Sequence, residues 1–307
     1  MIELAIMIEG QNGLNWPRWQ RIAAAVEDLG FVGLYRSDHF TNASPPDKDS
    51  LELWVSLTWL ASHTRRIEFG PLVTPMSFRH PALTARMAAA VDDLSGGRLT
   101  LGLGAGWQER EHRAFGFDLL DRRGRMQRFA EGVEVISLLL TSDAPVNFEG
   151  RFFRLQEAIL LPRPSRPGGP PILIGGSGLK RTLPLAARFA TQWNCIQLPP
   201  ERFREVNRYL DELLKQVGRP PEAVRRTMMT GCIFARDEAE LERKVAERTR
   251  GESSAEDLRQ RGAIVGTPAQ IREQLKALEA AGVQRLMLQW LDLDDLAGLE
   301  GLAELLY

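Results

Sequence analysis

Short apolar runs alternate with amphipathic stretches along most of the chain. In the stretch that holds Trp19, Ile22 and Val26, apolar residues recur every three to four positions, which predicts a helix with one buried face. A short run of consecutive apolar residues between such stretches predicts a strand that is buried on both faces. The predicted strands lie at 3–8, 31–35, 67–73, 99–103, 171–174, 193–196, 228–234 and 284–290.

Helices are predicted between these strands. Gly30 fits the end of the first helix, and Thr267 with Pro268 fits the beginning of a late one. Eight strands that alternate with helices over 307 residues predict an α/β fold, a (β/α)8 or TIM barrel that forms a single domain over residues 1–307. The predicted helices lie at 16–29, 51–63, 81–94, 109–115, 122–140, 179–190, 200–217 and 237–250, followed by one that begins at Thr267 and by a terminal helix.

Two segments interrupt the alternation. Residues 145–161 have the pattern of a β-hairpin that turns at Glu149 and Gly150, and a proline-rich connector follows at 162–171. Because strands and helices alternate again directly afterwards, we interpret 145–170 as an insertion in the barrel rather than as a domain boundary. A second insertion is expected at 251–265, where the polar segment 251–262 predicts a mobile loop that could close over an active site.

A glycine-rich loop follows the fourth predicted strand. Gly102, Gly104 and Gly106 stand at alternate positions, and Trp107 comes next. A doubly wound dinucleotide-binding fold is the competing interpretation, but its G-x-G-x-x-G fingerprint follows the first strand and needs a glycine where Trp107 stands. That interpretation fails on both counts. The glycines let either a ligand approach the backbone closely or the chain turn tightly.

Composition narrows the class of protein. Hydrophobic residues make up 44% of the chain and charged residues 26%, as in a globular protein with a substantial core, and a net charge of −1 gives no electrostatic basis for binding nucleic acid or an anionic membrane. The two cysteines, Cys195 and Cys232, predict neither a disulfide scaffold nor a zinc site and fit a reducing cytoplasm. No signal peptide or membrane span is expected, so we predict a cytoplasmic protein.

The active site of such a barrel lies where the strands end, at the C-terminal face. The residues at the predicted strand ends include no plausible metal cluster and no G-x-S-x-G nucleophile motif. Two glycine-rich loops that lead into helices suit an anionic group bound by backbone N–H groups, and the aromatic residues suit a flat ring, which favours a phosphate-bearing aromatic cofactor over hydrolysis. The candidates are Glu9, Gln11, Asp38, His39, Thr74, Gly104, Ala105, Gly106, Trp107, Gly175, Gly176, Ser177, Gly178, Asn194 and Trp290.

Structural alternatives stand beside these candidates. His39 is favoured as a site residue because of its position directly after a strand. His80 could cap a helix or contact a ligand, and His112 fits the surface or the rim of the site. Trp193 and Trp290, like Trp107, could stack on a bound ring or belong to the core.

The region 94–107 reads LSGGRLTLGLGAGW and resembles the signature region of the bacterial luciferase-like monooxygenases. The resemblance extends over nearly the whole chain in the family's order, and the most similar subgroup is the oxidoreductases that depend on FMN or on the deazaflavin coenzyme F420. The other matching motifs are SDHF at 37–40, VTP at 73–75, RHPA at 79–82, Glu109, Glu111 and His112, AFG at 114–116, PPILIGG at 170–176, Trp193 with Asn194, and Gly-Thr-Pro at 266–268.

The resemblance implies a (β/α)8 barrel, commonly dimeric, that holds FMN or F420 at its C-terminal face. It also implies a non-prolyl cis peptide bond in the third strand, near Pro71, Leu72 and Val73. By resemblance, His39 is a catalytic proton donor close to the reactive ring, and the loop 175–178 meets the phosphate. The implied cofactor-binding residues are Asp38, His39, Leu72, Val73, Thr74, Ala105, Gly106, Trp107, Gly175, Gly176, Ser177 and Gly178.

The implied activity is that of an F420- or FMN-dependent oxidoreductase or monooxygenase, a homodimer that acts on a small organic substrate. Deazaflavin-dependent sugar-phosphate dehydrogenases of the family have an acid/base Glu where this chain has Trp107, so their substrate and mechanism are not expected here. A non-catalytic flavin-binding protein on the same scaffold, or a barrel enzyme of unrelated chemistry, is the alternative. The loops 41–50, 145–170 and 251–265, where specificity is expected, show no pattern that names the substrate.

Overall fold

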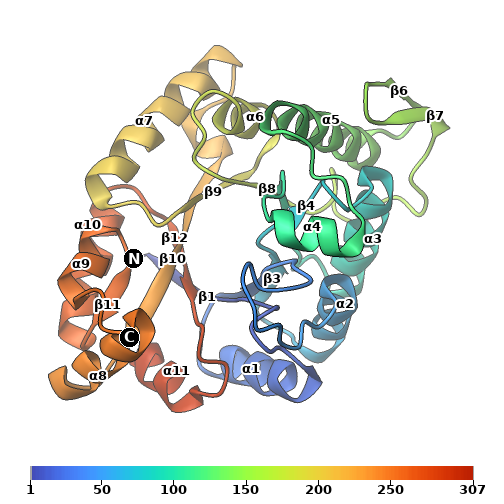
Figure 1. The fold of residues 1–307 in the computed structure, drawn as a ribbon. Helices are drawn as coiled ribbons and strands as arrows, with labels where there is room; N and C mark the ends of the chain where they lie inside the picture. The colour runs from blue at the N-terminus through green and yellow to red at the C-terminus, as the bar shows by residue number, and fades with distance from the viewer. Residues whose placement is uncertain (1, 307) are drawn as a thin grey trace.

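The computed structural model describes residues 2–306, in which the predicted strands form a parallel barrel (Figure 1). Neighbours around the sheet follow the order β3-β2-β1-β12-β10-β9-β8-β5-β4, and β11 (Ile264–Gly266) pairs only with β10. The barrel strands are β1 (Glu3–Ile8), β2 (Gly33–Arg36), β3 (Glu68–Pro71), β4 (Thr74–Pro75), β5 (Leu101–Gly104), β8 (Ile172–Gly175), β9 (Gln192–Ile196), β10 (Arg225–Phe234) and β12 (Arg285–Gln289).

The third predicted strand is interrupted and closes the barrel. Its two parts are β3, which pairs with β2, and β4, which pairs with β5. Between them the peptide bond from Leu72 to Val73 is cis, as the resemblance implies. With β3 and β4 counted as one interrupted strand, the described part of the chain has eight barrel strands, and the predicted (β/α)8 fold is confirmed.

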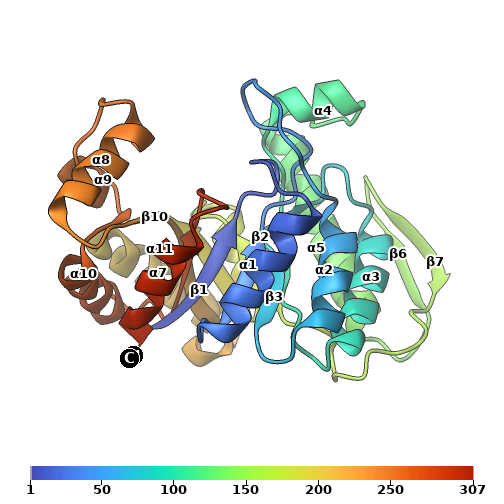
Figure 2. The same cartoon turned by 90° about the horizontal axis from the view of Figure 1, so that it is seen from below.

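Helices surround the barrel on its outside (Figure 1). None of the helices within residues 2–306 is both long enough and apolar enough to cross a membrane. Figure 2 shows α4, α8 and α9 at the end toward which the strands point. The helices are α1 (Trp16–Asp28), α2 (Leu53–His63), α3 (Pro81–Leu94), α4 (Glu109–Phe115), α5 (Arg122–Thr141), α6 (Thr182–Phe189), α7 (Pro200–Gln216), α8 (Glu238–Thr249), α9 (Ala255–Gln260), α10 (Pro268–Ala280) and α11 (Leu296–Ala303).

The two faces of β1 explain why the strands are continuous apolar runs. Ile6 and Ile8 are fully buried in the main hydrophobic core, together with apolar residues of the helices. Ala5 and Met7 alternate with them and pack inside the barrel with Tyr35 and other strand residues. A strand that is covered on both faces needs apolar side chains on both, so it does not alternate with polar residues.

The second insertion differs from its prediction. Residues 251–262 are predicted to be a loop, but they contain α9, and β11 follows and pairs with β10. Three of the six α9 residues are exposed and none is fully buried, so the segment has no strong apolar periodicity. The sequence feature that indicates this helix is the capping box of Ser254 and Asp257, whose side chains accept hydrogen bonds from each other's backbone N–H groups.

The first insertion has the predicted hairpin. β6 (Val146–Glu149) and β7 (Arg154–Ala158) pair in an antiparallel two-stranded sheet, separate from the barrel sheet. Figure 1 shows this hairpin projecting from the ring of helices, beyond α5. It therefore lies outside the barrel, while the strand and helix order continues with β8.

A buried arginine holds together the beginnings of several barrel strands. Arg285 of β12 is 1% exposed, and its guanidinium donates to Glu68 of β3 at 2.6 and 3.1 Å and to the Tyr35 hydroxyl of β2 at 2.9 Å. The Arg285 Nε also donates to Glu3 of β1 at 2.8 Å. Because Arg285 joins four strands of the sheet, its removal leaves Glu68 without an ion-pair partner and Glu3 with Arg225 alone.

We predict that Arg285→Met lowers the free energy of unfolding by about 3 kcal/mol, the low end for a broken buried ion pair, because Glu3 and Glu68 keep some solvent contact. Urea denaturation measures this loss. Arg202→Gln is the matched control, since it breaks an exposed pair with Glu205 and should cost less than about 1 kcal/mol. Equal losses in the two variants would show that the Arg285 cluster adds no more than a surface pair.

Candidate functional site

Glycines on β5 and β8 leave the space in which the interrupted strand lies. A Cβ atom on Gly102 would stand 2.1 Å from the carbonyl oxygen of Pro71, and one on Gly104 would stand 2.3 Å from Val73 Cγ2. A Cβ atom on Gly175 of β8 would be 2.9 Å from Val73 Cγ1. The sequence predicts that another group comes close to the backbone of these glycines. In the structure that group is the chain's own third strand.

Asp38 ties the end of β2 to the end of β4. Its buried carboxylate accepts a hydrogen bond from the Thr74 hydroxyl at 2.7 Å and two from Arg79, at 2.9 and 3.1 Å. Arg79 also donates to Glu52 at 2.7 Å. Charge-assisted bonds of this kind are strong and directional, so Asp38 and Thr74 are held in one geometry at the mouth of the barrel.

His39 is held by a buried carboxylate from α4. The Glu111 side chain is 1% exposed, and its Oε1 is 2.8 Å from His39 Nδ1. The other oxygen of Glu111 accepts the backbone N–H of Phe40 at 3.0 Å. A carboxylate can only accept, so Nδ1 of His39 carries a proton and Nε2 is the ring nitrogen that remains for other partners.

The surroundings of His39 raise its pKa. Burial alone would lower the pKa, because it disfavours the charged imidazolium. The hydrogen bond and the charge of Glu111 outweigh burial, and the charges of Glu9 and Asp38 add to them, so the pKa lies above its ordinary value. The protonated form of His39 therefore persists to a higher pH than in an isolated histidine, which suits a proton donor.

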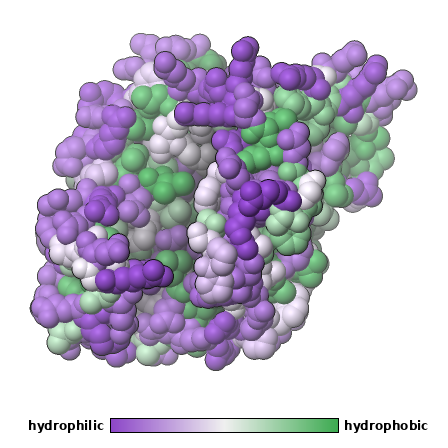
Figure 3. Space-filling view, in the orientation of Figure 1, coloured by the Kyte–Doolittle hydropathy of each residue, from purple (hydrophilic) through white to green (hydrophobic). Residues whose placement is uncertain are grey.

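Glu9 forms a second polar group at the strand ends. Its carboxylate accepts from Gln289 of β12 at 2.6 Å and from Gln11 at 2.8 Å. The Gln11 side-chain oxygen in turn accepts from the Ser37 hydroxyl at 2.6 Å, directly after β2. The ends of β12, β1 and β2 are therefore joined by one chain of hydrogen bonds, at the face seen in Figure 3, where hydrophilic residues line much of the rim.

The three tryptophans at strand ends have different environments. Trp107 is 60% exposed, and its ring meets the edge of His39 with a centroid distance of 5.7 Å. Trp193 is fully buried and stacks on Phe203, so it belongs to the core. Trp290 is also buried. Trp107 is thus the tryptophan of this set that is free to cover a bound ring.

One of the two other candidate histidines differs from its expected position. His112 is expected at the surface or rim, but it is buried, with Nδ1 2.7 Å from the carbonyl oxygen of Gln108. His80 stands at the N-cap of α3 and makes no capping hydrogen bond with its side chain. The sequence shows that His112 lies in a polar helix and that a proline follows His80. It does not show which of the two side chains is buried, because burial depends on tertiary packing.

The loop after β8 has backbone donors that are free. The N–H groups of Ser177 and Gly178 have no hydrogen-bond partner within residues 2–306, and both residues are partly or fully exposed ahead of α6. The Gly176 carbonyl accepts from Trp193 Nε1 at 2.8 Å, which holds the loop in place. Free N–H groups before a helix N-terminus fit a phosphate, so this loop could hold the phosphate-bearing tail of a cofactor.

Four of the predicted site residues lie at or next to Val73. Asp38 bonds to Thr74, and Gly104 and Gly175 flank Val73, while Ala105, Gly106 and Trp107 continue from β5. Two predicted residues have internal surroundings: Leu72 packs in the barrel interior, and Asn194 is buried and donates to Thr227 at 2.9 Å.

Sequence reasoning missed the partners of Asp38 and His39. Arg79 and Glu111 both stand in motifs that resemble the family, yet neither was assigned a contact. Glu111 has a local signal, since it is one of two carboxylates in the first turn of a short helix that follows the glycine loop. Its contact with His39 spans 72 positions, which no local pattern can predict.

The chain belongs to the luciferase-like monooxygenase family, because the family's sequence model matches residues 4–259. It is also similar to a solved structure of an F420-dependent secondary alcohol dehydrogenase in complex with an F420-acetone adduct, with a TM-score of 0.86 over 99% of this chain and 98% of that chain. The identity between these two chains is 18%, so this likeness shows the fold alone.

Two curated relatives are similar in sequence. A 4-hydroxyprotoasukamycin monooxygenase from Streptomyces nodosus subsp. asukaensis is 33% identical over 186 residues, which are 61% of this chain and 47% of that protein. An F420-dependent hydroxymycolic acid dehydrogenase from Mycobacterium tuberculosis is 33% identical over 175 residues, which are 56% of this chain and 46% of that protein. The chain spans about half the length of the curated relatives it matches.

We predict that Glu111→Gln lowers the pKa of His39 to below its ordinary value of about 6.5, because burial remains while the negative charge is lost. An NMR titration of the His39 ring protons measures this pKa. Glu109→Gln is the control, since Glu109 is an exposed carboxylate on the same helix. An unchanged His39 pKa in Glu111→Gln would contradict the role given to this contact.

Proposed function

We propose that the chain is an oxidoreductase that binds F420 or FMN at the C-terminal face of the barrel and acts on a small organic substrate. The observation that carries the proposal is the pairing of His39 with buried Glu111 beside the exposed ring of Trp107. The relatives support it, since one is an F420-dependent dehydrogenase and another a monooxygenase. The cytoplasmic location and the homodimer stay predictions.

The residues around Val73 fit such a cofactor. Gly104 and Gly175 have no side chains, so the strand ends on either side of Val73 carry no bulk that would cover it. Trp107 offers an exposed aromatic face, and the free N–H groups of Ser177 and Gly178 suit a phosphate. The bound group would supply two-electron redox chemistry, as hydride transfer for F420 or as oxygen activation for FMN.

His39 is proposed to hold and deliver the proton of the reaction. The Nδ1–H of His39 donates a hydrogen bond to Glu111, so the proton for the substrate would leave from Nε2. Trp107 has no group that can transfer a proton, and therefore His39 takes the acid role. Asp38 is proposed to support the site by fixing Thr74 and Arg79 rather than by moving a proton, since both of its oxygens accept hydrogen bonds from them.

We predict that the purified protein binds F420 or FMN with a dissociation constant in the micromolar range. Absorbance or fluorescence titration with each cofactor measures this, and the preferred cofactor distinguishes a reductase or dehydrogenase from a monooxygenase. Binding of neither cofactor at micromolar concentration would refute the proposal. A cofactor that binds without any substrate-dependent turnover would instead indicate a non-catalytic flavin-binding protein.

We also predict that His39→Ala lowers turnover by roughly 10²- to 10⁴-fold, the usual contribution of a general acid, while cofactor affinity stays nearly unchanged. In the wild type, turnover should fall as the pH rises through the raised pKa of His39, because the donor loses its proton there. In Glu111→Gln the same fall should begin at lower pH. Unchanged turnover in His39→Ala, measured on the same substrate and cofactor, would remove His39 from the mechanism.

A further inference from the structure

The loop between β2 and α2 lies beside α4 at the C-terminal face (Figure 2). Its base is closed by Ser50, whose hydroxyl donates to the His39 carbonyl oxygen at 2.6 Å. Every residue from Ala43 to Asp49 is exposed, so no apolar side chain holds this part of the loop in the core. Polar contacts with neighbouring segments therefore determine where this part of the loop lies.

An arginine of α4 binds the loop. Arg110 donates to both carboxylate oxygens of Asp47, each at 2.6 Å, and to the Asn42 carbonyl oxygen at 2.9 Å. Directly before α4, the Gln108 side chain donates to the Thr41 carbonyl oxygen at 2.9 Å. A single surface ion pair adds little to stability, but a bidentate arginine–carboxylate pair within a network has a defined geometry. The pair is therefore able to set the distance between α4 and the loop.

The first turn of α4 holds the loop at two places. Glu111 contacts the His39 ring and the Phe40 N–H, while Arg110 contacts the part of the loop that is farther along the chain. Consecutive helix residues point about 100° apart, so the two contacts together fix the rotation of α4 about its axis. Phe115 stacks on Phe40 near the end of the helix, with 4.6 Å between the ring centroids. A helix of seven residues is not stable by itself, so these contacts determine its position.

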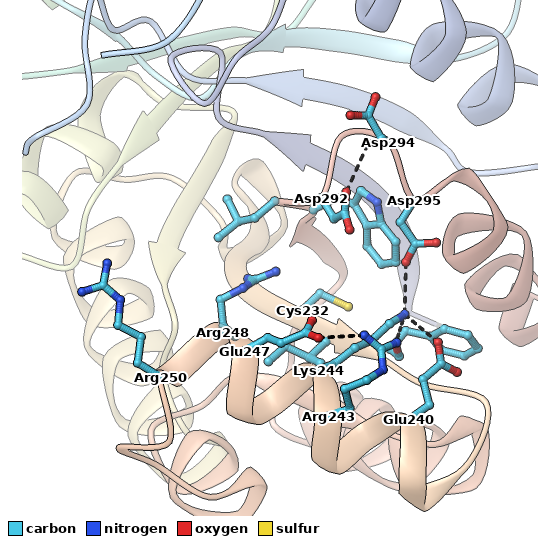
Figure 4. Close-up of a pocket in the computed structure, with 14 residues that line it drawn as sticks. Cys232, Glu240, Arg243, Lys244, Glu247, Arg248, Arg250, Asp292, Asp294 and Asp295 are labelled. Carbon is cyan, nitrogen blue, oxygen red and sulfur yellow. Dashed lines mark hydrogen bonds and ion pairs between the residues drawn. The ribbon is translucent and has the colours of Figure 1, made fainter. Parts of the chain in front are cut away.

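Other ion pairs at the C-terminal face have a different arrangement. Arg243 of α8 is bound to Glu247 at 3.0 Å (Figure 4). Both residues belong to the same helix, so the pair holds no second segment in place. Arg110 instead links α4 to another segment, and it directly precedes Glu111 in the chain.

We propose that Arg110 is a positioning residue of the site, which together with Asp47 holds α4 at the angle that keeps the Glu111 carboxylate on the His39 ring. The inference rests on the proposed function, because it concerns the proton donor proposed there. Arg110 acts through Glu111 and is not itself a catalytic residue. When the pair with Asp47 is broken, the first turn of α4 is free to rotate, and the carboxylate moves away from His39 Nδ1.

The effect of position differs in sign from the effect of charge. Burial lowers the pKa of His39, and the hydrogen bond and charge of Glu111 outweigh it, so a shift of α4 away from the ring lowers the pKa. Loss of the positive charge of Arg110 would by itself raise the pKa. The other charged or titratable groups near the pair, which stay in place in the variants below, are Glu9, Asp38, Arg79 and His112.

An NMR titration of the His39 ring protons tests the proposal without cofactor or substrate. Arg110→Gln should lower the pKa of His39 to a value between those of the wild type and of Glu111→Gln, because Glu111 is held less firmly while burial remains. Arg110→Gln combined with Asp47→Asn removes the pair without changing the net charge, and it should lower the pKa as well. The pair is exposed, so both variants should fold, which circular dichroism checks.

Two variants serve as controls. Arg113→Gln removes a positive charge from an exposed position of the same helix, and Arg243→Gln breaks a surface pair of α8. Neither should lower the pKa of His39. A pKa that rises in Arg110→Gln, or that is unchanged in the double variant, would overturn the proposal, since Arg110 would then act by its charge alone or not at all.

The pH profile of turnover separates positioning from a structural role. In Arg110→Gln, turnover should begin to fall at a lower pH than in the wild type, while KM and cofactor affinity stay nearly unchanged. Turnover that is lowered equally at every pH, with the pKa of His39 unchanged, would indicate a structural role and contradict the proposal. If neither F420 nor FMN binds, the proposed function fails, and the NMR titration still decides whether Arg110 positions Glu111.

Discussion

The packing of Val73 against glycines is the constraint on which the site depends. The backbone of the third strand approaches β5 so closely that a side chain at Gly102 or Gly104 would overlap it, and Gly175 of β8 meets the same valine. This approach sets where β4 begins, and Thr74 at its first position then donates to Asp38, which follows β2. Steric exclusion at three glycines thus determines which polar groups stand together at the barrel mouth.

The buried carboxylate of Glu111 fixes the position of α4, as the glycines fix the position of the third strand. Glu111 binds both the His39 ring and the Phe40 backbone N–H, so α4 and the end of β2 cannot move independently without breaking two hydrogen bonds. Removal of a buried partner costs more than the bond itself contributes, because the remaining group loses its solvation as well. The same contact fixes the orientation of the ring and raises its pKa, so position and proton affinity come from one side chain.

Sequence patterns predict this fold well because its strands are buried on both faces and its helices on one. The short α9 and the buried position of His112 escape such patterns, since each depends on contacts between distant segments or on few apolar residues. The cis bond at Leu72 is implied by the family resemblance and not by the apolar pattern. For the site, position at a strand end was enough to single out Asp38, His39 and Thr74. The partners of these residues come from other elements, so pairing has to be seen in three dimensions.

Each end of the barrel has an arginine that is bound to two carboxylates. At the closed end, every side-chain nitrogen of Arg285 donates to Glu3, Glu68 or Tyr35, and nothing is left for a ligand. At the open end, Arg79 is bound in the same way, to Asp38 and to Glu52. Charge-assisted bonds of this kind hold both ends in one geometry, so neither arginine by itself identifies a ligand-binding end. What distinguishes the open end is the exposed ring of Trp107 beside His39, where we propose that the ligand binds.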